Sequence, residues 1–179
     1  MNVSDMNTTG FNVPERVLDL GNQQVHKARI DMAERFFGRI DIGGFRLVYD
    51  LGEAALKDAV LKVAIDDDGI AQNKQEANPM FEPYYNELLV PVLASHPEGL
   101  WLIQKRVIPY YRHVPKPNKG ELARFKRRVA PIAKLFRMDL KDMTANHNLG
   151  LIDGKLLIFD YGMSQQFVDQ YYTRQRARW

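Results

Sequence analysis

Three clusters along the chain contain residues of the types that bind phosphate or a metal ion. The first is Gly43-Gly44-Phe45, which precedes a short segment of alternating apolar residues. Glycine lets backbone N–H groups approach a phosphate closely, and an aromatic residue at the tip of such a turn can shield the phosphate from water. A glycine pair also occurs in hairpin turns that bind nothing, and this alternative stays open.

The second cluster centres on Lys62, in the middle of the apolar run 60–64. A lysine in a buried strand needs a counter-charge, because an unpaired buried ammonium group is costly. Glu76, in the next predicted helix, is the candidate partner. The alternative is an exposed lysine on the outer face of an edge strand.

The third cluster combines Asp142 and Asn148 with Asp160, which follows a predicted hairpin. Carboxylate and amide oxygens that converge from a loop and a strand end suit Mg²⁺, which uses one or two carboxylates together with substrate phosphates. Without that convergence, the same residues are polar turns on either side of a hairpin.

The elements that would position these clusters follow from hydrophobic periodicity. It predicts one or two helices in 13–37, antiparallel strands at 45–49 and 60–64, helices over 70–77 and 82–93, and a strand over 100–108. The segment 109–120 contains three prolines and is a predicted connector. Asp153-Gly154 predicts a two-residue hairpin turn between strands at 149–152 and 155–159.

The clearest predicted helix follows the connector. Its apolar stripe comprises Leu122, Phe125, Val129, Ile132 and Phe136, at the spacing of three and four residues that marks one helix face. Pro131, inside this pattern, is expected to kink the helix or end it early.

Composition favours a single domain in a reducing, cytoplasmic location. The chain has 179 residues, 45% of them hydrophobic, and no cysteine. The absence of cysteine excludes a disulfide framework, a thiolate zinc site and a cysteine nucleophile. The longest apolar run, 88–94, is far too short to span a bilayer, and the first ten residues lack the features of a signal peptide. We therefore expect no membrane partner.

Charge is distributed unevenly between the two halves of the chain. Residues 1–104 carry 9 Lys and Arg against 16 Asp and Glu, a net charge of −7, whereas residues 105–179 carry 16 against 6, a net charge of +10. A basic half suits an anionic partner such as nucleotide phosphates, nucleic acid or an acidic protein. The alternative is that the basic residues coat the solvated face of a helix.

The order of the three clusters resembles the signature of the protein-kinase-like family, which runs from a glycine-rich loop through a strand lysine and a helix glutamate to a catalytic loop and Asp-Phe-Gly. Here the glycine pair, Lys62, Glu76, the 142–148 loop and Asp160-Tyr161-Gly162 follow in that order. The end of the pattern resembles small kinase-like proteins encoded by bacteriophages. The resemblance covers roughly residues 39–162.

The resemblance implies an α+β, protein-kinase-like fold with an antiparallel-sheet N-lobe followed by a reduced, mostly helical C-lobe. The implied organisation is one kinase-like domain, with a helical extension at 1–38, the N-lobe at 39–108 and a truncated C-lobe at 109–179. Only 17 residues follow Gly162, so we expect the later helices and the usual peptide platform of the family to be missing.

The implied chemistry is phosphoryl transfer from ATP with Mg²⁺. Lys62, held by Glu76, would grip the α- and β-phosphates. Asp142 would be the catalytic base, and Asn148 and Asp160 would bind the metal. The remaining implied ATP-binding residues are Gly43, Gly44 and Phe45 in the glycine loop, and Gln104 and Arg106 in a segment that is similar to the family's adenine-binding strand and hinge.

The sequence also departs from the family pattern. Asp41 and Arg46 stand where the first and third glycines would fall, and no His-Arg-Asp triplet precedes the loop. Asp139 is therefore a rival to Asp142 as the base. Asn146 is likewise a rival to Asn148 as the metal ligand.

These observations lead to one expected function and two alternatives. The expectation is an ATP- and Mg²⁺-dependent phosphotransferase, of the kind of a phage protein Ser/Thr kinase that acts on a host protein. The first alternative is a weak or inactive pseudokinase that binds and inhibits a host protein. The second is a nucleic-acid-binding protein that uses the basic stretch 105–141.

Overall fold

The computed structural model describes residues 11–52, 57–113 and 119–164. The chain divides into two compact units. Unit 1 comprises the described parts of residues 1–82 and 91–106, and unit 2 comprises those of residues 83–90 and 107–179. Each unit contains its own antiparallel sheet. The α+β class and the antiparallel sheet expected from the sequence are therefore confirmed.

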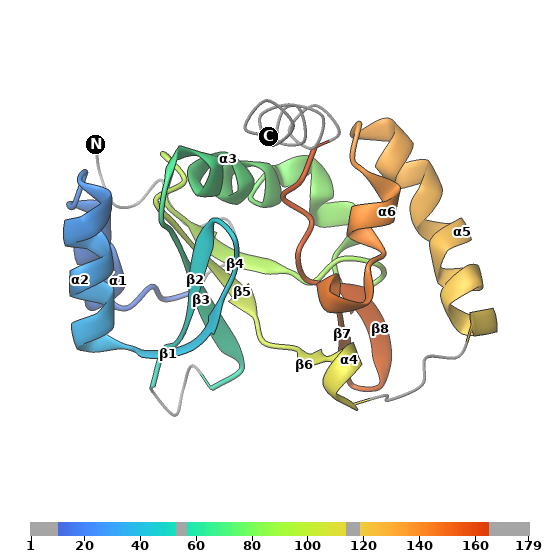
Figure 1. Ribbon diagram of the computed structural model, residues 1–179, viewed down its shortest axis with the longest axis horizontal. Coiled ribbons are helices and arrows are strands. Elements are labelled where there is room, and N and C mark those ends of the chain that lie inside the picture. The colour runs from blue at the N-terminus through green and yellow to red at the C-terminus, as the bar shows by residue number, and fades with distance from the viewer. Residues whose placement is uncertain (1–10, 53–56, 114–118, 165–179) are drawn as a thin grey trace, which may run out of the picture. The chain divides into compact units, whose positions relative to one another are not determined.

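Unit 1 is built on a five-stranded sheet with the strand order β1-β2-β3-β5-β4 (Figure 1). Its strands are β1 (Gly38–Ile42), β2 (Arg46–Asp50), β3 (Ala59–Ala64), β4 (Val92–Ser95) and β5 (Trp101–Lys105). Its helices are α1 (Glu15–Gly21), α2 (His26–Phe36) and α3 (Asp67–Glu76). All four strand pairs in this sheet are antiparallel.

One face of this sheet is apolar and packs against α1 and α2. Side chains alternate between the two faces of a strand, and residues paired across strands share a face. The core on this face contains side chains from α1, α2 and the strands β2, β3 and β5: Val17, Leu20, Ala33, Leu47, Tyr49, Leu61, Val63, Trp101 and Ile103. The helices predicted before residue 38 are therefore part of the core of unit 1.

A buried arginine ties α2 to the end of β3. Arg29 is fully buried and donates hydrogen bonds to the carbonyl oxygens of Gln23 and, at 3.2 Å, of Ala64. Burial lowers the pKa of the Arg29 guanidinium. These bonds satisfy the two terminal nitrogens of the guanidinium, whereas its Nε is buried without a hydrogen-bond partner among the described residues.

The other face of the sheet carries polar side chains and meets α3. Arg46 is paired with Ala64, and Lys62 lies between Val48 and Leu102, so both side chains belong to this face. α3 begins at the N-cap Asp66, whose side chain accepts a 2.8 Å hydrogen bond from the Gly69 backbone N–H. Four buried positions of α3 are Gly69, Gln72, Asn73 and Glu76. α3 thus buries a largely polar face, whereas α1 and α2 bury apolar residues.

Unit 2 combines a three-stranded sheet of order β6-β7-β8 with helices. Its strands are β6 (Ile108–Pro109), β7 (Leu149–Ile152) and β8 (Lys155–Ile158), and its helices are α4 (Tyr110–His113), α5 (Lys119–Leu135), α6 (Leu140–Met143) and the 3₁₀ turn η4 (Asn146–Asn148). The turn between β7 and β8 has positive φ at Asp153 (51°) and Gly154 (76°). The Asp-Gly hairpin predicted from the sequence is confirmed.

One expectation about a helix is wrong, and of the two effects expected of Pro131 the early helix end does not occur. The helix expected over 82–93 is absent: a 3₁₀ segment η3 (Pro79–Tyr84) is followed by turns and then by β4. Local turn bonds such as Leu88 N–H to Tyr84 O remain, but Val90 N–H donates to Ile158 O and Ile158 N–H to Leu88 O, so the end of this segment pairs with β8 instead of continuing a helix. α5 also continues through Pro131 to Leu135 and is not ended early by the proline.

Gly69 provides a test of how closely α3 approaches the sheet. A Cβ atom at this position would collide with the backbone oxygen of Phe45 and lie 3.2 Å from Ala64 Cα. Gly69→Ala should lower the free energy of unfolding by about 2 kcal/mol or more. Alanine would raise it at an uncrowded helix position, because alanine is the better helix former.

The measurement is urea unfolding of the wild type, Gly69→Ala and Gly38→Ala. Gly38 has open space where a Cβ would stand, so its variant should change the stability by no more than about 0.5 kcal/mol. Equal midpoints for the two variants would contradict the close approach of α3.

Candidate functional site

The first part of the candidate site is a buried ion pair between β3 and α3 in unit 1. Lys62 Nζ lies 2.9 Å from Glu76 Oε2, and the side chains are 5% and 0% exposed. The pairing expected from the sequence is therefore present, and Lys62 is not an exposed edge-strand residue. Removal of one partner from a buried pair typically costs about 3–5 kcal/mol, so these two positions depend strongly on each other.

Arg46 is a second cation on the same carboxylate. Its Nη2 lies 2.9 Å from Glu76 Oε1, and its Nη1 donates a 3.2 Å hydrogen bond to Asn73 Oδ1. Asn73 in turn donates to the carbonyl oxygen of Gly99 at 2.9 Å. Sequence reasoning treated Arg46 only as a departure from the glycine pattern and missed this role. The register of β2 with β3 places Arg46 and Lys62 on one face of the sheet, and alternation within each strand does not set this register.

The predicted glycine turn connects β1 to β2. Gly43 and Gly44 are exposed and Phe45 is partly buried. Gly43 N–H donates to Arg46 O at 2.8 Å, which closes the turn, and Phe45 O accepts from Ile65 N–H at 3.0 Å. The turn is therefore fixed to the end of β3, and at least the Gly43 donor is used inside it.

Gln104 and Arg106 lie at the end of β5. Gln104 is buried and stands between Val60 and Val92 in the sheet. Arg106 N–H donates to Asp58 O at 2.7 Å, and its side chain forms a 2.9 Å ion pair with Asp50. These contacts hold both residues within the sheet of unit 1, and their predicted part in adenine binding stays a prediction.

The second part of the candidate site lies in unit 2 and is built around the β7–β8 hairpin. Asn148 immediately precedes β7, and Phe159 N–H donates to Asn148 O at 2.9 Å, which closes the hairpin. Asp160 follows directly, so the hairpin brings the sequence-distant residues Asn148 and Asp160 to the same end. Tyr161 is buried and donates from its hydroxyl group to Val90 O at 2.9 Å.

α6 supplies Asp142 to the same place. Asn148 Nδ2 donates a 2.8 Å hydrogen bond to the backbone oxygen of Asp142. Asp142 Oδ2 is buried and has no hydrogen-bond partner among the described residues. Burial, and after it the charges of Asp160 and Asp139, raise the pKa of Asp142 to about 6, while His147 and Asn148 act in the opposite direction. A carboxyl group with a pKa near neutrality is suited to accept a proton.

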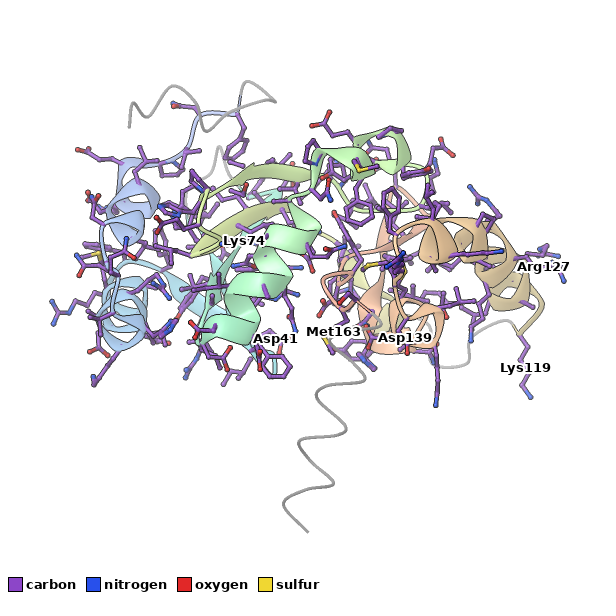
Figure 2. All side chains as sticks on the ribbon, turned by 90° about the horizontal axis from the view of Figure 1, so that it is seen from above. Asp41, Lys74, Lys119, Arg127, Asp139 and Met163 are labelled. Carbon is purple, nitrogen blue, oxygen red and sulfur yellow. The ribbon has the colours of Figure 1, made fainter. Side chains whose placement is uncertain are left out.

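Asp139 and Asn146, the alternatives to Asp142 and Asn148, differ from them in hydrogen bonding and burial. The Asp139 side chain is the N-cap of α6 and accepts a 2.8 Å hydrogen bond from Asp142 N–H (Figure 2). Asn146 is exposed, whereas Asn148 is buried. Between the alternatives left open by the sequence, the local geometry therefore favours Asp142 and Asn148.

Asp142, Asn148 and Asp160 carry side-chain oxygen atoms, the type of ligand that Mg²⁺ prefers. A cation would relieve the repulsion among Asp142, Asp160 and Asp139 and would satisfy the unpartnered Asp142 Oδ2. In the described part of the chain, no three or more His, Cys, Asp or Glu side chains are grouped so that they could hold a metal ion by themselves. Mg²⁺ does not require such a cage, because it retains water and binds substrate phosphates.

Comparison with known proteins leaves the family open. No model of a known protein family matches the chain, and a search of curated protein sequences finds no similar protein. Among the described residues, no helix has both the length and the apolar character needed to cross a membrane.

The raised pKa of Asp142 makes the stability of the protein depend on pH. Between about pH 4 and pH 6 the folded chain holds a proton that the unfolded chain has released, so the free energy of unfolding falls as the pH rises. Asp142→Asn stays neutral and should be more stable than the wild type above pH 6. Because the side chain is partly exposed, we expect a gain of about 1 kcal/mol at pH 7.5, shrinking towards zero near pH 4.

Urea unfolding at both pH values, with a chelator present, measures this difference. Asp153→Asn, in the exposed hairpin turn, serves as the control and should show no such dependence on pH. An equal gain for Asp142→Asn at pH 4 and pH 7.5 would rule out the proposed cause.

Proposed function

We propose that the chain is an ATP- and Mg²⁺-dependent phosphotransferase, a phage-type protein Ser/Thr kinase that acts on a host protein. The observation that carries the proposal is the buried Lys62–Glu76 ion pair, with Nζ 2.9 Å from Oε2. A strand lysine held by a helix glutamate is the arrangement with which protein kinases orient ATP phosphates. Here the pair stands on β3 and α3, which follow the β1–β2 glycine turn and β2 in the chain.

The described side chains would divide the work of phosphoryl transfer. Lys62 would bind the α- and β-phosphates, and the glycine turn at 43–45 would cover them. Asn148 and Asp160 would hold Mg²⁺, which supplies positive charge against the phosphate oxygens. Asp142 would orient the substrate hydroxyl group.

The proposed reaction transfers the γ-phosphoryl group of ATP to a hydroxyl group of the substrate. The hydroxyl oxygen of the substrate forms a bond to the γ-phosphorus atom as the bond from that atom to the β–γ bridging oxygen breaks, and ADP leaves. The hydroxyl proton passes to Asp142, whose raised pKa and unpartnered Oδ2 suit it to this role. Positioning and charge stabilisation account for most of the catalysis in such a transfer.

The alternative of a pseudokinase that binds and inhibits a host protein also has a specific observation in its favour. Gly43 N–H is occupied by Arg46 O within the turn, and Arg46, at the position of a family glycine, is 4% exposed and committed to Glu76. Both features reduce what this turn can offer to phosphate. ATP would then bind weakly or not at all, and the protein would act by contact alone.

The proposed kinase activity is tested with labelled ATP, Mg²⁺ and a host extract. Lys62→Met and Asp160→Asn should each reduce phosphate transfer by about 100-fold or more, since each removes a charge that acts on the phosphates or the metal. Lys57→Met and Asp153→Asn replace exposed residues of the same types and should leave transfer unchanged. Thermal unfolding of all four variants shows whether each one folds.

The same assay separates the two candidates. Stabilisation of the wild type by ATP and Mg²⁺ without transfer to itself or to any host protein would favour the pseudokinase. Neither stabilisation nor transfer, with any divalent ion, would overturn ATP binding altogether.

The exposed basic face of α5 supports the choice of an acidic protein as substrate or partner. Figure 2 shows Lys119 at the start of α5 and Arg127 on its outer side. The exposed basic residues of this helix are Lys119, Arg124, Lys126, Arg127, Arg128 and Lys134. Arg128 is within ion-pair distance of Glu87, at 3.6 Å. Opposite charge on a partner would speed encounter and fix its register.

Reversal of this charge should weaken recognition of acidic sequences. In the triple variant Arg124→Glu, Lys126→Glu, Arg127→Glu, we expect the KM for a serine peptide flanked by Asp and Glu to rise by about tenfold at low salt. The difference should shrink in 0.5 M salt, where exposed charges are screened. The control reverses Lys27 and Arg35, two exposed residues of α2. Equal use of acidic and Lys-flanked peptides by the wild type would contradict this specificity.

A further inference from the structure

α3 faces the sheet with three residues that lie on one side of the helix. Gly69, Asn73 and Glu76 are separated by four and three residues, which places them above one another along a single face. Each of them meets a different part of unit 1: Gly69 lies against the Phe45 carbonyl and Ala64, Asn73 bonds Arg46 and Gly99, and Glu76 pairs with both Arg46 and Lys62. The docking of α3 is therefore polar and specific in geometry.

Arg46 contacts two of these residues with two nitrogen atoms of one planar group. Its Nη1 donates to Asn73 and its Nη2 pairs with Glu76, at 3.2 and 2.9 Å. The two acceptors stand almost one helical turn apart, so rotation or sliding of α3 would lengthen both bonds together. A lysine could not reproduce this fork, because its charge is a single point.

The Glu76 carboxylate is consequently shared between two cations on separate oxygens. A fully buried carboxylate with one counter-ion would lose its only charged partner whenever that cation turned to another ligand, at considerable cost. Glu76 does not meet this difficulty, since Oε1 stays paired with Arg46 while Lys62 contacts Oε2. Lys62 can therefore engage an anion without leaving Glu76 uncompensated.

We propose that Arg46 is a positioning residue that fixes Glu76 and α3 in the Lys62-paired arrangement whether or not Lys62 also contacts nucleotide, so that this pairing needs no partner protein or modification. The catalytic consequence rests on the proposed function. The positioning itself is a property of unit 1 and can be measured in a protein that transfers no phosphate.

The first experiment measures positioning without activity, in the full chain. Arg46→Met removes the guanidinium and keeps an apolar chain of similar reach. We expect amide hydrogen exchange in α3 to accelerate by about tenfold or more relative to β5, and Lys62 to react several-fold faster with acetic anhydride, measured by mass spectrometry. Arg39→Met is the matched control, because Arg39 lies on the same hairpin but pairs with Glu34 at the surface. It should change neither quantity.

Arg46→Lys keeps the charge and covers the case in which Arg46→Met fails to fold. We expect it to accelerate exchange in α3 to an intermediate degree, because one ammonium group cannot serve both Asn73 and Glu76. Uniform acceleration over all strands would mean that Arg46 contributes only to global stability. Unchanged exchange in α3 would mean that other contacts fix the helix. Either result overturns the proposal.

The second experiment asks whether Arg46 acts through Glu76. In the wild-type background, Arg46→Met should lower kcat by about tenfold or more and change the KM for ATP much less. In a Glu76→Gln background, the same substitution should have little further effect on kcat. Equal losses in the two backgrounds would show that Arg46 does not act through Glu76 and would overturn the proposal.

The results distinguish failure of the proposed function from failure of the positioning role of Arg46. A wild type that transfers no phosphate but loosens α3 in Arg46→Met would overturn the proposed function and support the positioning role. A wild type that transfers phosphate, together with an Arg46→Met variant that keeps both kcat and slow exchange in α3, would overturn the positioning role and leave the proposed function standing.

Discussion

The Glu76 carboxylate is fully buried, and the arrangement of unit 1 around it follows from the need to neutralise its charge. A buried carboxylate is tolerable only with well-placed cations and hydrogen bonds. Two cations reach it here, Lys62 from the middle of β3 and Arg46 from the start of β2. The register of β2 with β3 places both on one face of the sheet. The other face is thereby left for the apolar core with α1 and α2.

The polar docking of α3 has a consequence for how the helix is held. An apolar helix face is held by many weak, non-directional contacts, none of which pairs one particular atom with another. Asn73 and Glu76 instead bond to defined nitrogen atoms of Arg46, and Gly69 leaves no room between the helix and the Phe45 carbonyl. Such contacts define one position sharply. They suit a helix whose task is to orient a lysine.

In unit 2, by contrast, a partly buried carboxyl group lies near other carboxylates. Asp142, Asp160 and Asp139 are near enough that the charges of the last two raise the pKa of the first, and Asp142 Oδ2 lacks a donor within the described residues. Unit 1 gathers cations around a carboxylate, whereas unit 2 gathers carboxylates. The proposed function assigns a Mg²⁺ ion to this arrangement.

The sequence by itself determined the features that depend on neighbouring residues. The Asp153-Gly154 turn follows from residues that accept positive φ, and the stripe of α5 follows from helical spacing. The Lys62–Glu76 pairing was predicted because a charged residue inside an apolar strand needs a partner, but only the central place of β3 in the sheet excluded an exposed edge-strand lysine. The helix expected over 82–93 did not form, since the backbone of Leu88 and Val90 bonds to Ile158, almost seventy residues away. Local periodicity contains no information about such a partner. For the same reason only the tertiary structure could assign Arg46 to Glu76 and reveal Asp142 Oδ2 as unpartnered: both depend on which distant side chains share a buried space.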